Sequence, residues 1–201
     1  MEKDKKMIPF RTQVKFFLDT SSPIDEALFT GVFQRWIQDN ALGELLIDVA
    51  DYRHVFQGPG TVLIGHESDY TIDNRDGRIG LIYTRKRQTT EDVATQLRTS
   101  LQRNLKAAEL LEHEAAFKPA LKFNISEIEV RFVDRLQFQN NPATFQSIKD
   151  DVTAVLSEFF GAAAVQIEPV QGDVRDLFAL RVTASGVSNL ADVKEAVKSG
   201  V

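Results

Sequence analysis

The segment VKFFLDTSSP, at residues 14–23, sets the pattern of the fold because it joins an apolar run to a helix start. Its first five residues are compact and apolar, which predicts a buried strand. Ser22 is a good helix cap, and Pro23 suits the first helical position. We therefore expect a strand followed by a helix over residues 23–40, with Trp36 on its buried face.

The same order returns in the second half of the chain. Alternating apolar residues at 123–132 predict a strand, and Asn141-Pro142 then opens a helical pattern. Further strands are expected at Leu45–Val49, Thr61–Ile72, Arg78–Tyr83, Val165–Ile167 and Leu177–Val182, with a long helix over 90–114 and a short closing helix. The chain thus predicts an α+β fold of two ferredoxin-like βαββα units, with a mostly antiparallel sheet and helices on one face.

This order divides the chain into residues 1–117 and a shorter half at 118–201, either as two units or as one merged domain. The first half is longer because residues 50–77 form an inserted hairpin, closed by the turn residues 74–77. Stability alone does not require such an excursion, and long loops on a compact scaffold often carry binding residues.

Composition excludes several classes of function. The 201 residues include 24 basic and 29 acidic side chains, and this acidic balance argues against a protein that binds nucleic acid. The absence of cysteine excludes disulfides and thiolate chemistry. No apolar stretch is long enough for a membrane span or a secretory signal, so we expect a cytoplasmic protein that does not bind membranes.

Most candidate functional residues lie in or beside the inserted segment, around QGPGTVLIGHESDY at residues 57–70. Alternation along a strand places Asp48, Tyr52 and His54 on one face. Glycines 58 and 60 around Pro59 predict a tight turn, and a phosphate loop is excluded because its Lys-Ser/Thr pair is missing. The residues predicted to bind a ligand are Asp48, Asp51, Tyr52, His54, His66 and Tyr70.

Two histidines beside carboxylates leave two kinds of chemistry open. His54 and His66, with Asp48 or Asp51, match a two-histidine, one-carboxylate set for a divalent metal if adjacent strands bring them together. Alternatively, His54, His66 and Glu67 are candidate catalytic groups for proton transfer. In the simplest interpretation, each imidazole only forms hydrogen bonds that hold the loop.

The sequence of residues 45–87, with its segments DVADY, HV, GPG and LIGHE, resembles that of a group of bacterial proteins of unknown function. This resemblance implies a bacterial cytosolic protein and brings no activity, substrate or cofactor with it. From the residues, we expect a module that binds a small molecule or a protein through residues 48–70, and that forms a homodimer. The alternative is a metal-dependent or acid–base enzyme that uses His54 and His66.

Overall fold

The computed structural model of the chain describes residues 7–21, 23–87 and 90–193. Within them, one antiparallel sheet has the strand order β2-β3-β4-β5-β1-β6-β8-β7. Its strands are β1 (Thr12–Leu18), β2 (Leu46–Asp51), β3 (Thr61–Gly65), β4 (Ser68–Asp73), β5 (Gly80–Arg85), β6 (Phe123–Phe132), β7 (Ala164–Pro169) and β8 (Phe178–Ser185). The helices are α1 (Leu28–Asp39), α2 (Val93–Glu112) and α3 (Pro142–Phe160), and the short 3-10 turns are η1 (Arg75–Gly77) and η2 (Leu190–Asp192). The predicted α+β class with an antiparallel sheet is confirmed.

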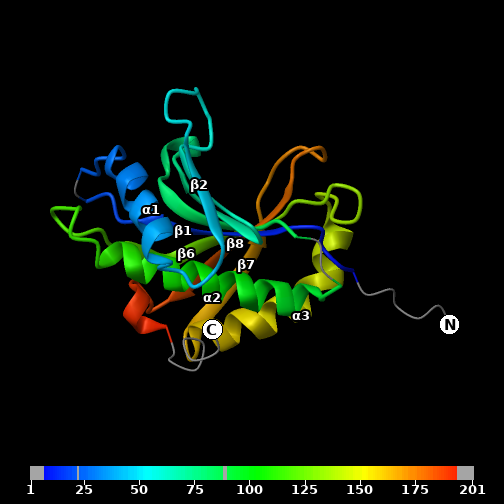
Figure 1. Cartoon of the computed structure of the whole chain (residues 1–201). Coiled ribbons are helices and arrows are strands. Elements are labelled where there is room, and N and C mark those ends of the chain that lie inside the picture. The colour runs from blue at the N-terminus through cyan, green and yellow to red at the C-terminus, as the bar shows by residue number, and fades with distance from the viewer. Residues whose placement is uncertain (1–6, 22, 88–89, 194–201) are drawn as a thin grey trace.

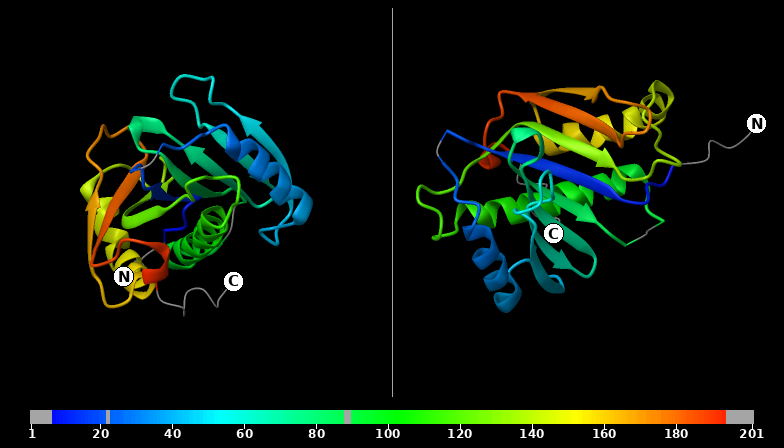
Figure 2. Two further views of the ribbon diagram at one scale, coloured as in Figure 1. Left: turned by 90° about the vertical axis from the view of Figure 1, so that its left-hand side faces the viewer. Right: turned by 90° about the horizontal axis from the view of Figure 1, so that it is seen from above.

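The helices cover one face of this sheet (Figure 1 and Figure 2). On β1, Val14 and Phe16 are fully buried on the helix side, where the ring of Phe16 lies 6.1 Å from that of Phe159 in α3. Because side chains alternate along a strand, Gln13 and Lys15 lie on the opposite face. We call this opposite face, which no helix of the described residues covers, the open face.

The first residues of α1 and α3 can be compared with the predicted helix starts. Helix α3 begins at Asn141-Pro142 as predicted, and the side chain of Asn141 caps it by accepting from the backbone N–H of Thr144 at 2.9 Å. Helix α1 instead begins at Leu28, later than predicted. The reason is local: the carboxylate of Asp25 accepts from the N–H of Ala27 at 3.0 Å, which holds these residues in a turn. Ser22, the predicted cap, lies outside the described residues.

The inserted segment differs from the prediction at its centre. The single strand expected over residues 61–72 is two strands, β3 and β4, which pair with each other and reverse at His66 and Glu67. Gly65 allows the reversal, because a Cβ there would lie 2.8 Å from the carbonyl oxygen of Ser68. The expected turn at 74–77 then leads from β4 into β5.

Both halves of the chain contribute to this one sheet. The first strand of each, β1 and β6, pair antiparallel at its centre. The β2–β3 loop, the β4–β5 turn and the end of β1 consequently lie at the same end of the sheet. None of the helices in the described ranges is long and apolar enough to cross a membrane.

Candidate functional site

The structure does not bring the two candidate histidines together. In the β2–β3 pair, Asp51 is opposite Thr61 and Leu46 is opposite Gly65. His54 therefore follows β2 beyond the Thr61 end of β3, whereas His66 follows the Gly65 end. The length of β3 alone separates them by about 13 Å, at about 3.3 Å per residue. Neither a metal site nor a proton-transfer site can use both imidazoles in this arrangement.

His66 is an exposed turn residue with two polar neighbours. Its Nδ1 lies 2.9 Å from Oε1 of Glu67, and its Nε2 lies 2.5 Å from Nη2 of Arg87. Arg87 also donates to the carbonyl oxygen of His66 at 3.2 Å. These contacts link the β3–β4 turn to the chain that follows β5. His54 is exposed in the loop after β2.

The two candidate aspartates on β2 also point apart. Asp48 lies opposite Ile64 on the open face, and its Oδ1 accepts from the backbone N–H of Val49 at 2.8 Å. Asp51 lies on the helix side, where the hydroxyl of Thr30 in α1 is 3.5 Å from its Oδ2. Within the described part of the chain, no group of three or more histidines and carboxylates is placed to hold a metal ion.

Tyr70, another candidate, is fully buried on the helix side of β4. Its hydroxyl donates to the carboxylate of Glu44, which also accepts from the hydroxyl of Ser68 at 2.6 Å. Burial, and then the negative charge of Glu44, raise the pKa of Tyr70. In this structure the phenol anchors the loop after α1 to the sheet and is not accessible to a ligand.

The inserted segment nevertheless builds a cavity, which we call the loop cavity. Its volume is about 640 Å³, and it lies between the 52–60 loop, which projects from the sheet in Figure 1, and turn η1. Of the candidate residues, Tyr52 lines it. The main lining residues that the sequence did not indicate are Glu26, Arg53, Phe56, Asn74 and Arg75. One signal was available, since an apolar Val55-Phe56 pair at the tip of a polar loop is unusual.

The 52–60 loop has a fixed conformation. The N–H of Tyr52 donates to the carbonyl oxygen of Gly60 at 2.7 Å, which closes the loop at its base. Gly60 has φ +72°, and a Cβ there would lie 2.1 Å from the carbonyl oxygen of Ile72, so no side chain fits. Gln57 also adopts a positive φ, of +54°, which is uncommon for a residue other than glycine. These contacts determine the path of the loop that forms one wall of the cavity.

Arginines held by carboxylates give this cavity its charge. Nε of Arg53 lies 2.9 Å and 3.0 Å from the two carboxylate oxygens of Asp51. Hydrogen bonds from the Arg53 side chain and backbone lower the pKa of Asp51 to about 2, so the carboxylate is ionised at neutral pH. Nε of Arg75 is held in the same way by Oδ1 of Asp73 at 2.7 Å.

The loop cavity therefore combines apolar rings with positioned guanidinium groups and an amide. Such a lining is suited to binding, because it offers both apolar contact and directed hydrogen bonds. No protein-family model, curated protein or solved structure matches this chain.

Proposed function

We propose that the protein is a small-molecule-binding module and that the loop cavity is its binding site. The observation that carries this proposal is the cavity itself: its volume of about 640 Å³ falls in the range of about 300–1,000 Å³ typical of ligand pockets. Phe56 supports it, because 91% of this side chain is exposed at the cavity, where it has no role in the core. A bound ligand would cover part of this apolar surface.

The fixed loop conformation also favours binding. A wall that is already ordered loses little conformational entropy when a ligand arrives, which improves affinity. Gln57 adopts an uncommon positive φ, and Gly60 packs closely against the backbone of Ile72. Backbone conformations of this kind are frequent at binding sites, which supports a binding role for this loop.

Equilibrium dialysis against a bacterial metabolite extract, followed by mass spectrometry of the retained molecules, tests this function. Asn74→Trp places a large side chain in the loop cavity, and Gln146→Trp adds the same side chain on the exposed surface of α3. We expect wild type and Gln146→Trp to retain the same molecules and Asn74→Trp to lose them. Equal retention by all three proteins, or by none, would contradict the proposal.

A second candidate function, docking of a partner protein, is favoured by the distribution of exposed apolar residues. The described chain has nine large hydrophobic side chains that are exposed, and five of them lie between residues 45 and 56. They are Leu45, Ile47, Tyr52, Val55 and Phe56. Leu45 and Ile47 lie towards the end of β2 near His66, and Tyr52, Val55 and Phe56 follow its other end. Exposed apolar side chains of this kind are typical of protein-binding surfaces. A second copy of the chain, giving the expected homodimer, is one partner for it.

Light scattering after size-exclusion chromatography tests this second candidate. If copies associate through these residues, Ile47→Ser should shift the mass towards the monomer, whereas Val174→Ser, at an exposed position in another loop, should not. A wild-type protein that is already monomeric at high concentration would remove the homodimer from consideration.

We also propose that the chain consists of two ferredoxin-like βαββα units. The order β6-β8-β7 supports this for the second half, because α3 connects two strands that have a third strand between them, as in a split βαβ motif. In the first half, β1, α1, β2 and β5 follow the same plan, with β3 and β4 as the insertion.

A further inference from the structure

A second, smaller cavity adjoins the loop cavity at turn η1. It has a volume of about 230 Å³ and is lined by residues that include Phe17, Arg78, Ser126 and Glu127. Gly77 lines both cavities. Its φ is +68°, and no heavy atom lies within 4 Å of the position that a Cβ would occupy. Gly77 therefore places no side chain where the two cavities adjoin, and the space beside it is open; we call this position the saddle.

Each cavity contributes one arginine beside this saddle. Arg75 lines the loop cavity and is bound through Nε to Asp73, while 43% of its side chain is exposed. Arg78 lines the smaller cavity and is bound through Nη1 to Oε1 of Glu127 at 2.7 Å, with 46% exposed. The guanidinium of Arg78 lies 3.8 Å from the ring centroid of Phe17, which fixes its plane. The contacts of each arginine with described residues use only part of its five N–H donors, so the remaining donors of each guanidinium can bind a ligand.

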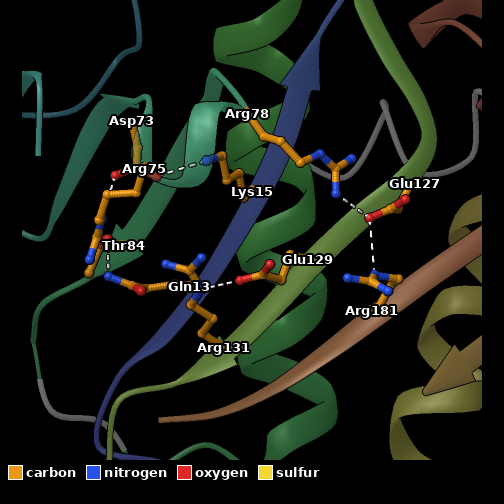
Figure 3. A network of polar contacts seen from close by, with 10 residues as sticks. All are labelled: Gln13, Lys15, Asp73, Arg75, Arg78, Thr84, Glu127, Glu129, Arg131 and Arg181. Carbon is orange, nitrogen blue, oxygen red and sulfur yellow. Dashed lines mark hydrogen bonds and ion pairs between the residues drawn. The ribbon is translucent and has the colours of Figure 1, made fainter. Parts of the chain in front are cut away.

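The carboxylates behind these arginines do not neutralise them completely. Asp73 also accepts from Nζ of Lys15 at 2.7 Å, and Oε1 of Glu127 also lies 3.3 Å from Nε of Arg181 (Figure 3). Each carboxylate is thus shared by two cations, so its single negative charge does not neutralise both of them. Glu26 is the carboxylate that lines the loop cavity itself; it adds a negative charge there and accepts from the side-chain amide of Asn74 at 2.9 Å.

We propose that the ligand is an elongated dianion that lies across Gly77, with one anionic group at Arg75 and the other at Arg78. Planar guanidinium groups with free N–H donors bind carboxylate and phosphate groups in a bidentate manner. This inference rests on the proposed binding function and adds the chemical class of the ligand.

Isothermal titration calorimetry tests the proposal with linear dicarboxylates from succinate to pimelate, the monocarboxylates of equal length, and pyrophosphate as the phosphate probe. We expect one dianion to bind about tenfold or more tightly than its monoanionic counterpart, as for one additional charged hydrogen-bonding group. Preference for a dicarboxylate identifies carboxylates as the natural groups, and preference for pyrophosphate identifies phosphates. Preference for a dicarboxylate supports the elongated dianion. Because pyrophosphate is compact, preference for it supports the proposal when Arg75→Gln and Arg78→Gln both weaken its binding, and overturns the proposal when only one of them does.

Variants then test the position of the ligand. Arg75→Gln and Arg78→Gln should each weaken the binding of the preferred dianion about tenfold, whereas Arg98→Gln, in an exposed ion pair with Glu158, should not.

Gly77→Asn fills the saddle with a residue that tolerates positive φ and should also abolish the preference for a dianion. Gly186→Asn is its matched control, because Gly186 has φ +80° and similar open space elsewhere. Thermal unfolding confirms that each variant is folded.

Two results would overturn the proposal. In the first, no dianion binds better than its monoanion, although the metabolites retained in dialysis are still lost in Asn74→Trp. In the second, Arg75→Gln weakens binding but Arg78→Gln and Gly77→Asn do not, which confines the ligand to the loop cavity. In both cases the loop cavity remains the binding site, so failure of the dianion is distinguishable from failure of the proposed function.

Discussion

Lys15 and Asp73 form a buried ion pair on the open face, with Nζ of the lysine 2.7 Å from Oδ2 of the aspartate. The lysine side chain reaches from β1 past the intervening strand β5 to β4 (Figure 3). Gly80 on β5 makes this crossing feasible, because a Cβ there would lie 2.9 Å from Cε of Lys15. Burial lowers the pKa of Lys15 and on its own would raise that of Asp73, but hydrogen bonds from Lys15 and Arg75 reverse this and lower the pKa of Asp73.

Removing Asp73 should therefore cost more stability than removing Lys15. Asp73→Asn leaves a buried lysine without its counter-ion, which costs about 3–5 kcal/mol. Lys15→Met keeps Arg75 on Asp73, so we expect a loss of roughly 1–2 kcal/mol, closer to that of an apolar replacement. Urea unfolding measures both values, with Arg98→Gln as an exposed-pair control that should lose at most about 1 kcal/mol. Equal losses for Asp73→Asn and Lys15→Met would contradict this account.

Asp48→Ala should increase self-association. β2 is an edge strand, and the Asp48 carboxylate occupies the backbone N–H of Val49, while Leu45 and Ile47 are 66% and 56% exposed nearby. An unblocked edge beside apolar side chains is a template for pairing with another strand. Sedimentation velocity should show more dimer or larger species for Asp48→Ala than for wild type, and no change for Asp150→Ala on the surface of α3. An unchanged distribution for Asp48→Ala would show that this carboxylate does not protect the edge.

The protein should lose stability between pH 10 and pH 12 through Tyr83. Burial, and then the charge of Glu44, raise the pKa of this phenol from 10.0 to about 12. A raised folded-state pKa means that the folded chain keeps a proton which the unfolded chain releases above pH 10, so the stability is present below pH 10 and lost as the pH rises to 12. The loss is roughly 2–3 kcal/mol. Tyr83→Phe should remove this part of the pH dependence of urea unfolding, and a profile identical to wild type would count against the raised pKa.

Substitutions of the two histidines should act independently. Because β3 separates them, His54→Ala and His66→Ala should change the free energy of unfolding additively, within about 0.5 kcal/mol. The same double-mutant cycle, repeated with Zn²⁺ present, should give no coupling between them. A coupling energy above about 1 kcal/mol, with or without zinc, would mean that the two rings meet and that the placement described above is wrong.

Local signals explain why much of the architecture could be predicted from the sequence. A strand at 123–132 and a helix capped by Asn141 follow from alternation and capping, which are encoded within a few residues. The reversal at His66 and Glu67 was missed because Gly65-His66-Glu67-Ser68 is a short interruption between two runs of strand-forming residues, and the whole stretch was interpreted as one strand.

The site was harder to predict because it depends on strand order. The sequence directed attention to residues 48–70, and Tyr52 lines the loop cavity, but Arg75 joins it only because the β2–β3 loop and the β4–β5 turn share one end of the sheet. The hypothesis of a joint site for the two histidines required adjacent strands to bring them together across the turn. The register of β2 and β3, which no local pattern determines, places them apart.

The central pairing of β1 with β6 also bears on how the chain reaches its native state. These strands are more than 100 residues apart in the sequence. During synthesis, the edge of β1 that pairs with β6 therefore stays unpaired until more than half of the chain has been made. Distant antiparallel pairing slows folding and lengthens the interval in which unpaired strands are prone to aggregate. Expression at low temperature or with chaperones should therefore benefit this protein more than a helical protein of equal size.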